Sequence, residues 1–266
     1  MKNRPSETQI DPAAAMLRRD EMGGLVKGLR LIEAFDSAHT RMTLSEAARR
    51  VNITPAAARR CLLTLCALGY ANTDGKLFWM GHGALRVAYA YSASTRLPRM
   101  LQPTLDALCE RTRESAALSV LDGSVAVIAA RSSARRTMRV GTGIGSRLPL
   151  YCSSAGRALM ANMPRSTWLA LVQSRPMEAM TANTETTVTG LARMLKECQE
   201  RGYSTCDEEI ELGVRSIAVP LYDLHGTTVA AITLSTRAER MTIAELVTDC
   251  LPAMLRAQEW AKTRMH

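Results

Sequence analysis

The sequence predicts an α+β protein in two parts: a small helical part that ends in a β-hairpin, and a larger part that mixes helices with an antiparallel sheet. Three observations support this division. Two helix-start signals lie close together between residues 43 and 55. An Asp-Gly pair then separates two short β-type runs within residues 70–79. Beyond residue 114, β-type runs alternate with helical patterns as far as the C-terminus.

The first predicted helix runs from about Gly24 to Phe35. Leu25, Leu29, Ile32 and Phe35 recur at helical spacing, so we expect them to form one buried stripe. The polar segment before it, residues 1–22, contains two prolines and few apolar residues. We expect this N-terminal tail to be disordered.

Capping residues predict two further helices. Thr43 and Glu46 have the spacing of a capping box, in which each side chain satisfies a backbone N–H of the other residue. Asn52 is suited to a left-handed turn, and Thr54-Pro55 combines an N-cap residue with proline at the first helical position. The pattern therefore predicts a helix, a sharp turn and a second helix.

The second of these helices is amphipathic. Its predicted inward arc consists of Ala58, Cys61, Leu62, Leu65 and Leu68. Ala56, Arg59 and Arg60 point outward, so two guanidinium groups and a small residue share one face. This face suits a nucleic-acid groove, although a solvated arginine pair would have the same pattern.

A hairpin follows directly. Residues 70–73 and 76–79 flank Asp74-Gly75, a preferred two-residue turn, and Lys76 lies beside the tip. Such a hairpin after two closely spaced helices is typical of a winged helix-turn-helix, which lays one helix in the DNA major groove. The residues expected to contact DNA are Thr43, Ser45, Thr54, Ala56, Ala57, Arg59, Arg60 and Lys76. A winged helix that binds protein instead of DNA would fit the same pattern.

The positive charge is concentrated in this part of the chain. The formal net charge is +9, and residues 1–100 hold 15 Lys/Arg against 8 Asp/Glu, whereas the remainder holds 19 against 17. A basic first third favours contact with phosphates, although it could also be a solvated surface. No apolar run approaches the length of a membrane span, so we expect a cytoplasmic protein without membrane contact.

The larger part begins after a predicted linker helix at residues 82–95, which could pair with a partner chain. The domain boundaries we predict are therefore 1–22, 23–81, 82–95 and 96–266. Helices are expected at 97–112, 155–163, 165–172, 189–201 and 242–262, and strands at 115–121, 125–131, 137–141, 203–209, 214–222 and 228–235. This order is similar to that of a GAF-like sensor domain with an antiparallel sheet.

Motifs for enzyme chemistry are weak. Gly141, Gly143 and Gly145 have GxGxG spacing without the following helix that a dinucleotide site requires. Cys152-Ser153-Ser154 lacks the GxSxG frame of a nucleophile elbow, and no histidine is placed by a motif to act as base. Helix capping by a serine is the simpler interpretation, and the same helix start could also hold a carboxylate ligand. A small-molecule enzyme remains the alternative from another class.

The sequence predicts no metal site or cofactor. The seven cysteines form no CxxC pair and the four histidines are far apart, so the cysteines are expected to be small buried residues. The acidic run Asp207-Glu208-Glu209 could serve acid/base chemistry, but Arg215 is available to pair with it. A structural ion pair is the simpler role. Alternation along a strand would aim Asp207 and Glu209 to the same side of the sheet.

From Gly23 to Lys262 the chain resembles IclR-family transcriptional regulators. The residues that carry this resemblance are the helix-turn-helix and its wing, LPLYCSSAGRALMA at 148–161, and GYSTCDEEIELGVRSIAVPLYD at 202–223 ahead of AAITLS. TPAAARRCLLTLCALGY and DGKLFWMG are similar to the branch that controls β-ketoadipate, protocatechuate and hydroxybenzoate catabolism.

The resemblance implies an effector-responsive regulator that binds palindromic promoter DNA as a homodimer or a dimer of dimers. It also implies a C-terminal pocket for a small effector, here an aromatic or short carboxylic acid. Carried over by motif position, the pocket residues would be Leu148, Ser154, Ala155, Cys206, Val214, Ser216, Thr233 and Ser235. Cys206 departs from the family pattern, because some members carry an acid there.

Overall fold

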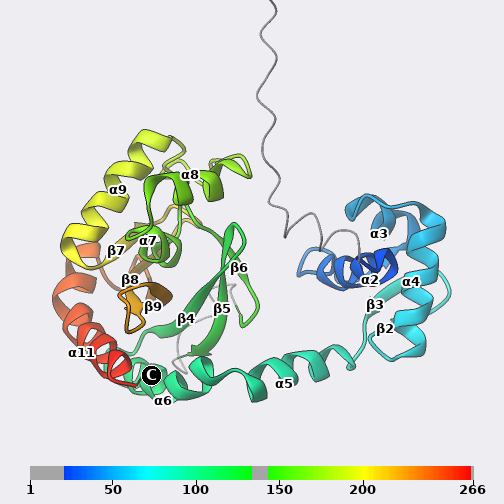
Figure 1. Ribbon diagram of the computed structural model, residues 1–266, viewed down its shortest axis with the longest axis horizontal. Coiled ribbons are helices and arrows are strands. Elements are labelled where there is room, and N and C mark those ends of the chain that lie inside the picture. Colours follow the sequence, from blue (N-terminus) through cyan, green and yellow to red (C-terminus); the bar gives the residue numbers. More distant parts are fainter. Residues whose placement is uncertain (1–20, 134–142, 265–266) are drawn as a thin grey trace, which may run out of the picture. The chain divides into compact units, whose positions relative to one another are not determined.

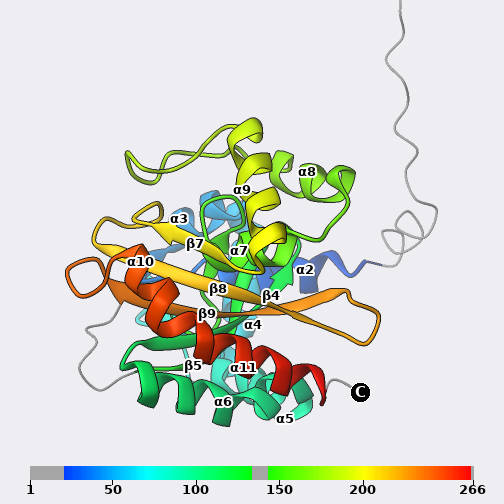
Figure 2. The same ribbon diagram turned by 90° about the vertical axis from the view of Figure 1, so that its left-hand side faces the viewer.

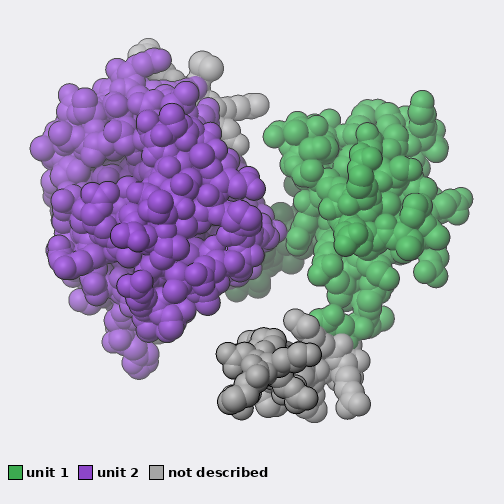
Figure 3. Space-filling view, turned by 90° about the horizontal axis from the view of Figure 1, so that it is seen from above, with its two compact units in different colours: residues 1–94 green, residues 95–266 purple. Residues whose placement is uncertain are grey.

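The computed structural model describes residues 21–133 and 143–264 (Figure 1). The chain divides into two compact units, Met1–Ser94 and Thr95–His266 (Figure 3). Residues 1–20 of the tail expected at 1–22, the strand expected at 137–141 and Gly141 of the GxGxG run lie outside the described residues. In the two described ranges, no helix combines the length and apolarity needed to cross a membrane.

Unit 1 is a winged helix-turn-helix followed by one further helix. Its elements are α2 (Gly23–Glu33), β1 (Met42–Thr43), α3 (Leu44–Arg50), α4 (Pro55–Ala67), β2 (Ala71–Thr73), β3 (Leu77–Met80) and α5 (Ala84–Ser94). The strands form an antiparallel sheet in the order β1-β3-β2. The short strand β1 was not expected from the sequence, because two residues are too few to show alternation.

The capping chemistry is confirmed. The backbone N–H of Thr43 donates to Glu46 Oε2 at 2.7 Å, and the N–H of Glu46 donates to Thr43 Oγ1 at 3.3 Å. Thr54 Oγ1 accepts the N–H of Ala57 at 3.3 Å, with Pro55 at the first helical position. Asn52 has φ of 53°, the left-handed conformation expected between the two helices.

The prediction of the buried faces of α2 and α4 is partly wrong. Leu31 is fully buried, whereas Leu25 and Leu29 are 60% and 51% exposed. Leu68, placed on the inward arc of α4, is 56% exposed. The reason is that α2 carries apolar residues on two faces, and it packs on α4 through Leu31 and Ala34.

The turn of the wing is offset by one residue from the expectation. Asp74 and Leu77 form the closing pair, so the central residues are Gly75 and Lys76. Gly75 has φ of +94°, and Asp74 Oδ1 accepts the N–H groups of Lys76 and Leu77 at 2.9 and 2.7 Å. Asp therefore supplies an acceptor before the turn, while Gly supplies the positive φ within it. The hairpin at 122–125 is built in the same way, with Asp122 opposite Val125 and Gly123 at positive φ within the turn.

Unit 2 is built on a six-stranded antiparallel sheet in the order β6-β5-β4-β9-β8-β7 (Figure 2). Its strands are β4 (Ser115–Asp122), β5 (Val125–Ser132), β6 (Arg147–Pro149), β7 (Ser204–Asp207), β8 (Val214–Tyr222) and β9 (Thr228–Arg237). Its helices are α6 (Arg96–Thr112), α7 (Ser154–Met160), α8 (Arg165–Gln173), α9 (Val188–Arg201), α10 (Ile243–Glu245), η1 (Leu246–Cys250) and α11 (Leu251–Lys262). The expected α+β class and antiparallel sheet are confirmed.

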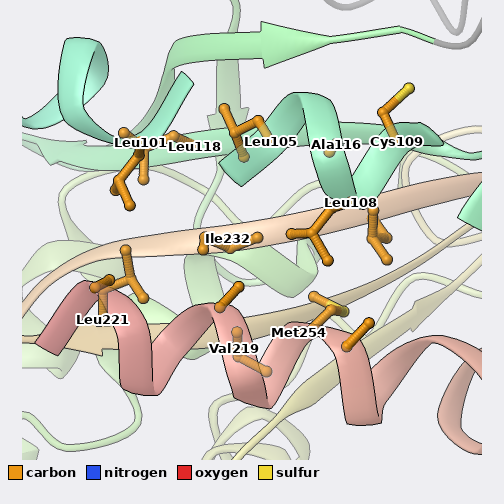
Figure 4. Close-up of a cluster of buried hydrophobic side chains, with 14 of the residues drawn as sticks. Leu101, Leu105, Leu108, Cys109, Ala116, Leu118, Val219, Leu221, Ile232 and Met254 are labelled. Carbon is orange, nitrogen blue, oxygen red and sulfur yellow. The ribbon is translucent and has the colours of Figure 1, made fainter. Parts of the chain in front are cut away.

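The two faces of this sheet have separate roles. On one face, Ala116 and Leu118 of β4 and Ile232 of β9 pack against α6 and α11, as Figure 4 shows. On the other face, Ala218 and Ala231 belong to the cluster beneath α7 and α9. Small side chains on this second face let α7 approach closely and leave room for a cavity beside its N-terminus.

The C-terminal helix begins at the expected capping box but is interrupted by a π-helical turn. The N–H of Thr242 donates to Glu245 Oε2 at 2.7 Å, and the N–H of Leu251 donates to the carbonyl of Leu246. Pro252 follows, has no N–H, and would crowd a carbonyl four residues earlier in a regular α-helix. The wider turn relieves this conflict.

Candidate nucleic-acid interface and ligand cavity

The outward face of α4 is the face that the sequence indicates. Ala56, Arg59 and Arg60 are exposed, whereas Ala57 is only 8% exposed. The methyl group of Ala57 therefore packs inside unit 1, contrary to the expected contact with a groove. Leu63 is 40% exposed and adds an apolar group to the same helix.

The other expected DNA contacts fall into two groups. Ser45, Thr54 and Lys76 are exposed, and Lys76 lies at the tip of the wing. Thr43 is half-buried, and its hydroxyl both accepts from the Glu46 N–H and donates to Glu46 Oε2 at 2.8 Å. Thr43 therefore acts first as a helix cap.

Sequence reasoning missed a basic cleft beside the wing. The cleft has a volume of about 350 Å³ and is lined by Ala38, His39, Arg41, Met42, Glu46, Arg49 and Arg50. The guanidinium of Arg41 stacks 4.3 Å from the ring centre of Trp79 in β3. Arg50 is held by Asp36 and by the carbonyl of Ala34 at 2.8 Å. The sequence alone does not single out Arg41, because its contact with Trp79 arises only when β1 pairs with β3.

A second cavity lies in unit 2, between the sheet and the start of α7. It has a volume of about 70 Å³, and all eight residues expected to form the effector pocket line it. These residues are Leu148, Ser154, Ala155, Cys206, Val214, Ser216, Thr233 and Ser235. Eight more residues complete its lining and were missed: Ser115, Ala117, Ser119, Ile128, Arg131, Ser153, Ile210 and Glu211. Five of them lie on β4 and β5, and only the strand register, which includes a bulge at Leu118/Ser119, reveals that they face the same side of the sheet.

The cavity carries one arginine and several hydroxyl groups. Arg131 Nε donates to Ser133 Oγ at 2.9 Å and its Nη2 to Ser115 Oγ at 3.5 Å, and burial lowers the pKa of its guanidinium. Ser154 and Ser216 share a hydrogen bond of 2.7 Å. Glu211 is an exposed acidic residue of the lining. The site therefore has a cationic group and a polar wall within a largely closed space.

The start of α7 is fixed by short-range contacts. Ser153 is its N-cap and accepts the N–H of Gly156 at 3.0 Å, which agrees with the capping role expected for a serine here. A Cβ on Gly156 would lie 2.4 Å from both Cα and O of Leu150, so this helix touches the preceding loop through its backbone. No described histidine lines the cavity beside it.

Two acids of the run at 207–209 face different ways, contrary to the expectation of a shared side. Asp207 is exposed and accepts from Arg215 Nε at 2.6 Å. Glu209 is buried and forms a two-point ion pair with Arg157 of α7, which is 2% exposed. Glu208 has φ of 58°, which ends the strand alternation between them. The structural role expected for this run is therefore the one observed.

The thiols of Cys152 and Cys206 are buried. Cys206 donates to the carbonyl of Cys152 at 3.2 Å, and burial raises the pKa of Cys206 and raises that of Cys152 to about 12. All seven cysteines are free. Among the described residues, no group of three or more His, Cys, Asp or Glu could hold a metal ion.

Two family models match the chain, one in each unit. Residues 24–75 match the model of the IclR helix-turn-helix domain, and residues 89–262 match that of the bacterial transcriptional regulator IclR C-terminal domain. The Pca regulon regulatory protein of Pseudomonas putida is 36% identical over 90% of this chain and 82% of its own length. The p-hydroxybenzoate hydroxylase transcriptional activator of Acinetobacter baylyi is 33% identical over 88% of this chain and 89% of its own.

A solved structure extends the similarity to the cavity-bearing unit. The inducer-binding domain of a double mutant of the PobR transcription factor from Acinetobacter, in complex with 3-hydroxybenzoic acid, is 28% identical with a TM-score of 0.59. The match covers 62% of this chain and 97% of that domain. These relatives are transcriptional regulators, not enzymes. The chain therefore belongs to the IclR family of bacterial transcriptional regulators.

Proposed function

We propose that this regulator binds double-stranded promoter DNA of aromatic-catabolism genes through unit 1 and binds an aromatic or short carboxylic acid in the cavity of unit 2. Its action on promoters requires a cytoplasmic location. The observation that carries the proposal is the exposed Arg59–Arg60 pair on α4 of a winged helix-turn-helix. The effector would shift the population of DNA-binding geometries and so change operator affinity.

The DNA contacts follow from the chemistry of the exposed residues. Arg59 and Arg60 can bind base edges or phosphates, and Lys76 can reach a phosphate from the wing. Ser45 and Thr54 lie at helix starts, where side-chain hydroxyl groups and main-chain N–H groups can bind the phosphates of the DNA backbone. The exposed methyl of Ala56 can contact a thymine methyl, so part of the sequence preference would come from DNA shape.

The effector class follows from the cavity. Arg131 is the cationic group of the lining, and a carboxylate is the anion that a guanidinium binds in a two-point geometry. Ile128, Leu148 and Ala117 supply apolar walls on which an aromatic ring can pack. The relatives named for Pca and p-hydroxybenzoate control, and the PobR domain holding 3-hydroxybenzoic acid, support an aromatic acid.

A homodimer, or a dimer of dimers, is supported by the apolar surface of unit 1. Helix α5 has no buried residue, and its Leu85, Val87 and Tyr89 are 67%, 57% and 74% exposed. A groove of about 730 Å³ is lined by residues of α2 and α4 together with Leu68, Tyr70 and Val87. Apolar area of this extent is typical of a surface that a partner covers. Sedimentation equilibrium of the full chain measures the oligomeric state directly.

The test is operator binding by the Arg59→Ala/Arg60→Ala variant. We expect affinity for a promoter fragment to fall by at least about tenfold. The slope of log affinity against log salt should also become shallower by about one for each phosphate that the protein no longer neutralises. The matched control, Arg165→Ala/Arg193→Ala, removes the same charge from exposed positions of unit 2 and should leave affinity nearly unchanged.

Three outcomes contradict parts of the proposal. Unchanged affinity at physiological salt would contradict the role of α4 as recognition helix. An equal loss of operator affinity in both double variants would mean that the loss depends only on net charge and not on the position of the arginines. Failure of the unmodified protein to bind promoter fragments at any salt concentration would favour a protein-binding winged helix instead.

A further inference from the structure

We propose that Ser119 and Thr233 select the effector by hydrogen bonding to a hydroxyl group that the acid carries away from its carboxylate. This inference rests on the proposed role of the cavity as the effector site. It narrows the ligand from an aromatic or short carboxylic acid to a hydroxylated aromatic monocarboxylate. It also identifies two residues that determine specificity, one of which, Ser119, lies outside the pocket set expected from the sequence.

The first observation is that both hydroxyl groups are buried and unpaired. Ser119 is 1% exposed and Thr233 is 7% exposed. Neither hydroxyl has a hydrogen-bond partner among the described residues. Buried polar groups in proteins are nearly always hydrogen-bonded, since an unpaired one bears the full cost of desolvation. Two such groups in the lining of one cavity indicate a ligand that supplies the missing partners.

The strand register places the two hydroxyl groups together. Ala117 of β4 is opposite Thr233 of β9, and Ser119 is opposite Ala231. Ser119 and Thr233 are therefore diagonal neighbours on the same face of adjacent strands, close enough to contact one ligand group. Both line the cavity from the sheet side.

The guanidinium of Arg131 reaches toward the Ser115 end of the same surface. Arg131 is opposite Ala117, and Ser115 lies four residues before Ser119 on β4. Ser115 and Ser119 are therefore about 13 Å apart between Cα atoms, whereas Thr233, opposite Ala117, is only two strand positions from Ser115. A carboxylate bound at Arg131 would therefore direct the remainder of the ligand along β4 toward Ser119 and Thr233.

The other polar groups of the cavity are less able to discriminate. Ser154 and Ser216 already bond to each other, and Cys206 already donates to the carbonyl of Cys152. Ser153 caps α7 and donates to the carbonyl of Pro149 at 2.6 Å. Ser119 and Thr233 are the lining residues whose hydroxyl groups are buried without a partner among the described residues, and a ligand hydroxyl, which both donates and accepts, can pair with them.

The chemistry excludes two neighbouring ligand classes. An unsubstituted aromatic acid would close the cavity over both hydroxyl groups and leave them without partners. A dicarboxylate would bury a second negative charge at an end of the cavity whose lining supplies hydroxyls rather than a cation. A hydroxyl group on the ring can hydrogen-bond to Ser119 and Thr233 without burying a second charge.

The test is calorimetric titration of the full chain with benzoate, 4-hydroxybenzoate, 3-hydroxybenzoate and benzene-1,4-dicarboxylate. We expect at least one hydroxybenzoate to bind about tenfold more tightly than benzoate, or more, as one well-made hydrogen bond in a buried site provides. The Ser119→Ala/Thr233→Val variant should bind benzoate as well as or better than the unmodified protein, and should lose the preference for the hydroxylated acid.

The matched control is Thr228→Val, because Thr228 also has a buried hydroxyl without a partner but lies outside the cavity. It should retain the preference. If the double variant fails to fold, Ser119→Ala alone, which removes one oxygen atom, should reduce the preference severalfold.

The outcomes separate this inference from the proposed function. A hydroxyl preference that survives the double substitution, or that is missing from the unmodified protein, overturns the inference while effector binding stands. Binding of none of the four acids, with operator binding intact, overturns both the inference and the assigned effector class.

Discussion

The buried ion pair between Arg157 and Glu209 provides a sharp test of what holds the cavity together. Both side chains are nearly inaccessible, at 3% and 6% exposure. Arg157 also donates to the carbonyls of Tyr151 and Thr205, at 2.9 and 3.0 Å. The pair thereby joins α7 to the turn that carries Ile210 and Glu211, residues of the cavity lining.

The perturbation is Glu209→Gln, which keeps the shape of the side chain but leaves the guanidinium without its counter-charge. Removing one partner of a buried ion pair costs about 3–5 kcal/mol. We expect a loss near the lower end, about 3 kcal/mol, because Arg157 retains two backbone acceptors and a glutamine oxygen can accept one hydrogen bond. A loss of this size is a large fraction of the stability of an ordinary domain.

The assay is urea unfolding followed by tryptophan fluorescence, since Trp168 is buried in the cluster beside α7. Asp207→Asn is the matched control, because it removes an exposed acid of the same run and should change stability little. Arg157→Met combined with Glu209→Gln should recover part of the loss, since no charge then remains buried. A Glu209→Gln loss no larger than that of Asp207→Asn would refute the reasoning.

Three more predictions concern single residues. Gly156→Ala should lower the urea midpoint of unit 2 despite the better helix propensity of alanine, because the new methyl group meets the backbone of Leu150. Gly28→Ala in α2 is the control: its methyl group meets no atom within 4 Å, so the urea midpoint of unit 1 should not fall. The contribution of Cys152 to stability should be constant below about pH 9 and be lost as the pH rises toward about 12, because the folded state binds the thiol proton more tightly than the unfolded state does. In urea midpoints measured against pH, Cys152→Ala should therefore make the fall between these values less steep. Arg41→Ala should weaken operator binding and make it less dependent on salt, because stacking on Trp79 fixes a guanidinium in a position where it can bind a phosphate. Fluorescence anisotropy at several salt concentrations measures both effects, and an unchanged salt slope would contradict the phosphate contact.

Local chemistry made much of unit 1 predictable. The caps at Thr43 and Thr54 and the left-handed turn at Asn52 depend on a few neighbouring residues, and each forms as expected. The exposure of Leu25 and Leu29 was not predictable in this way, because it depends on which of two apolar faces of α2 meets α4.

The cavity shows the same limit. Its motif-borne residues were predictable from resemblance, and all of them line one space. Ser119 and Arg131 carry no motif, and their shared face is set by pairing between β4, β5 and β9. Glu209 was misplaced because the positive φ of Glu208, a tertiary feature, breaks the alternation that a strand would have continued.

The strict alternation along β4 separates two kinds of evolutionary change. Ala116 and Leu118 belong to the cluster under α6 and α11, whereas Ala117 and Ser119, their immediate neighbours, line the cavity. Substitutions at positions 115, 117 and 119 can therefore reshape the cavity without changing the residues of β4 that pack under α6 and α11. Under the proposed effector role of the cavity, a change of inducer preference should be sought first at these three positions, for example in the directed evolution of a biosensor.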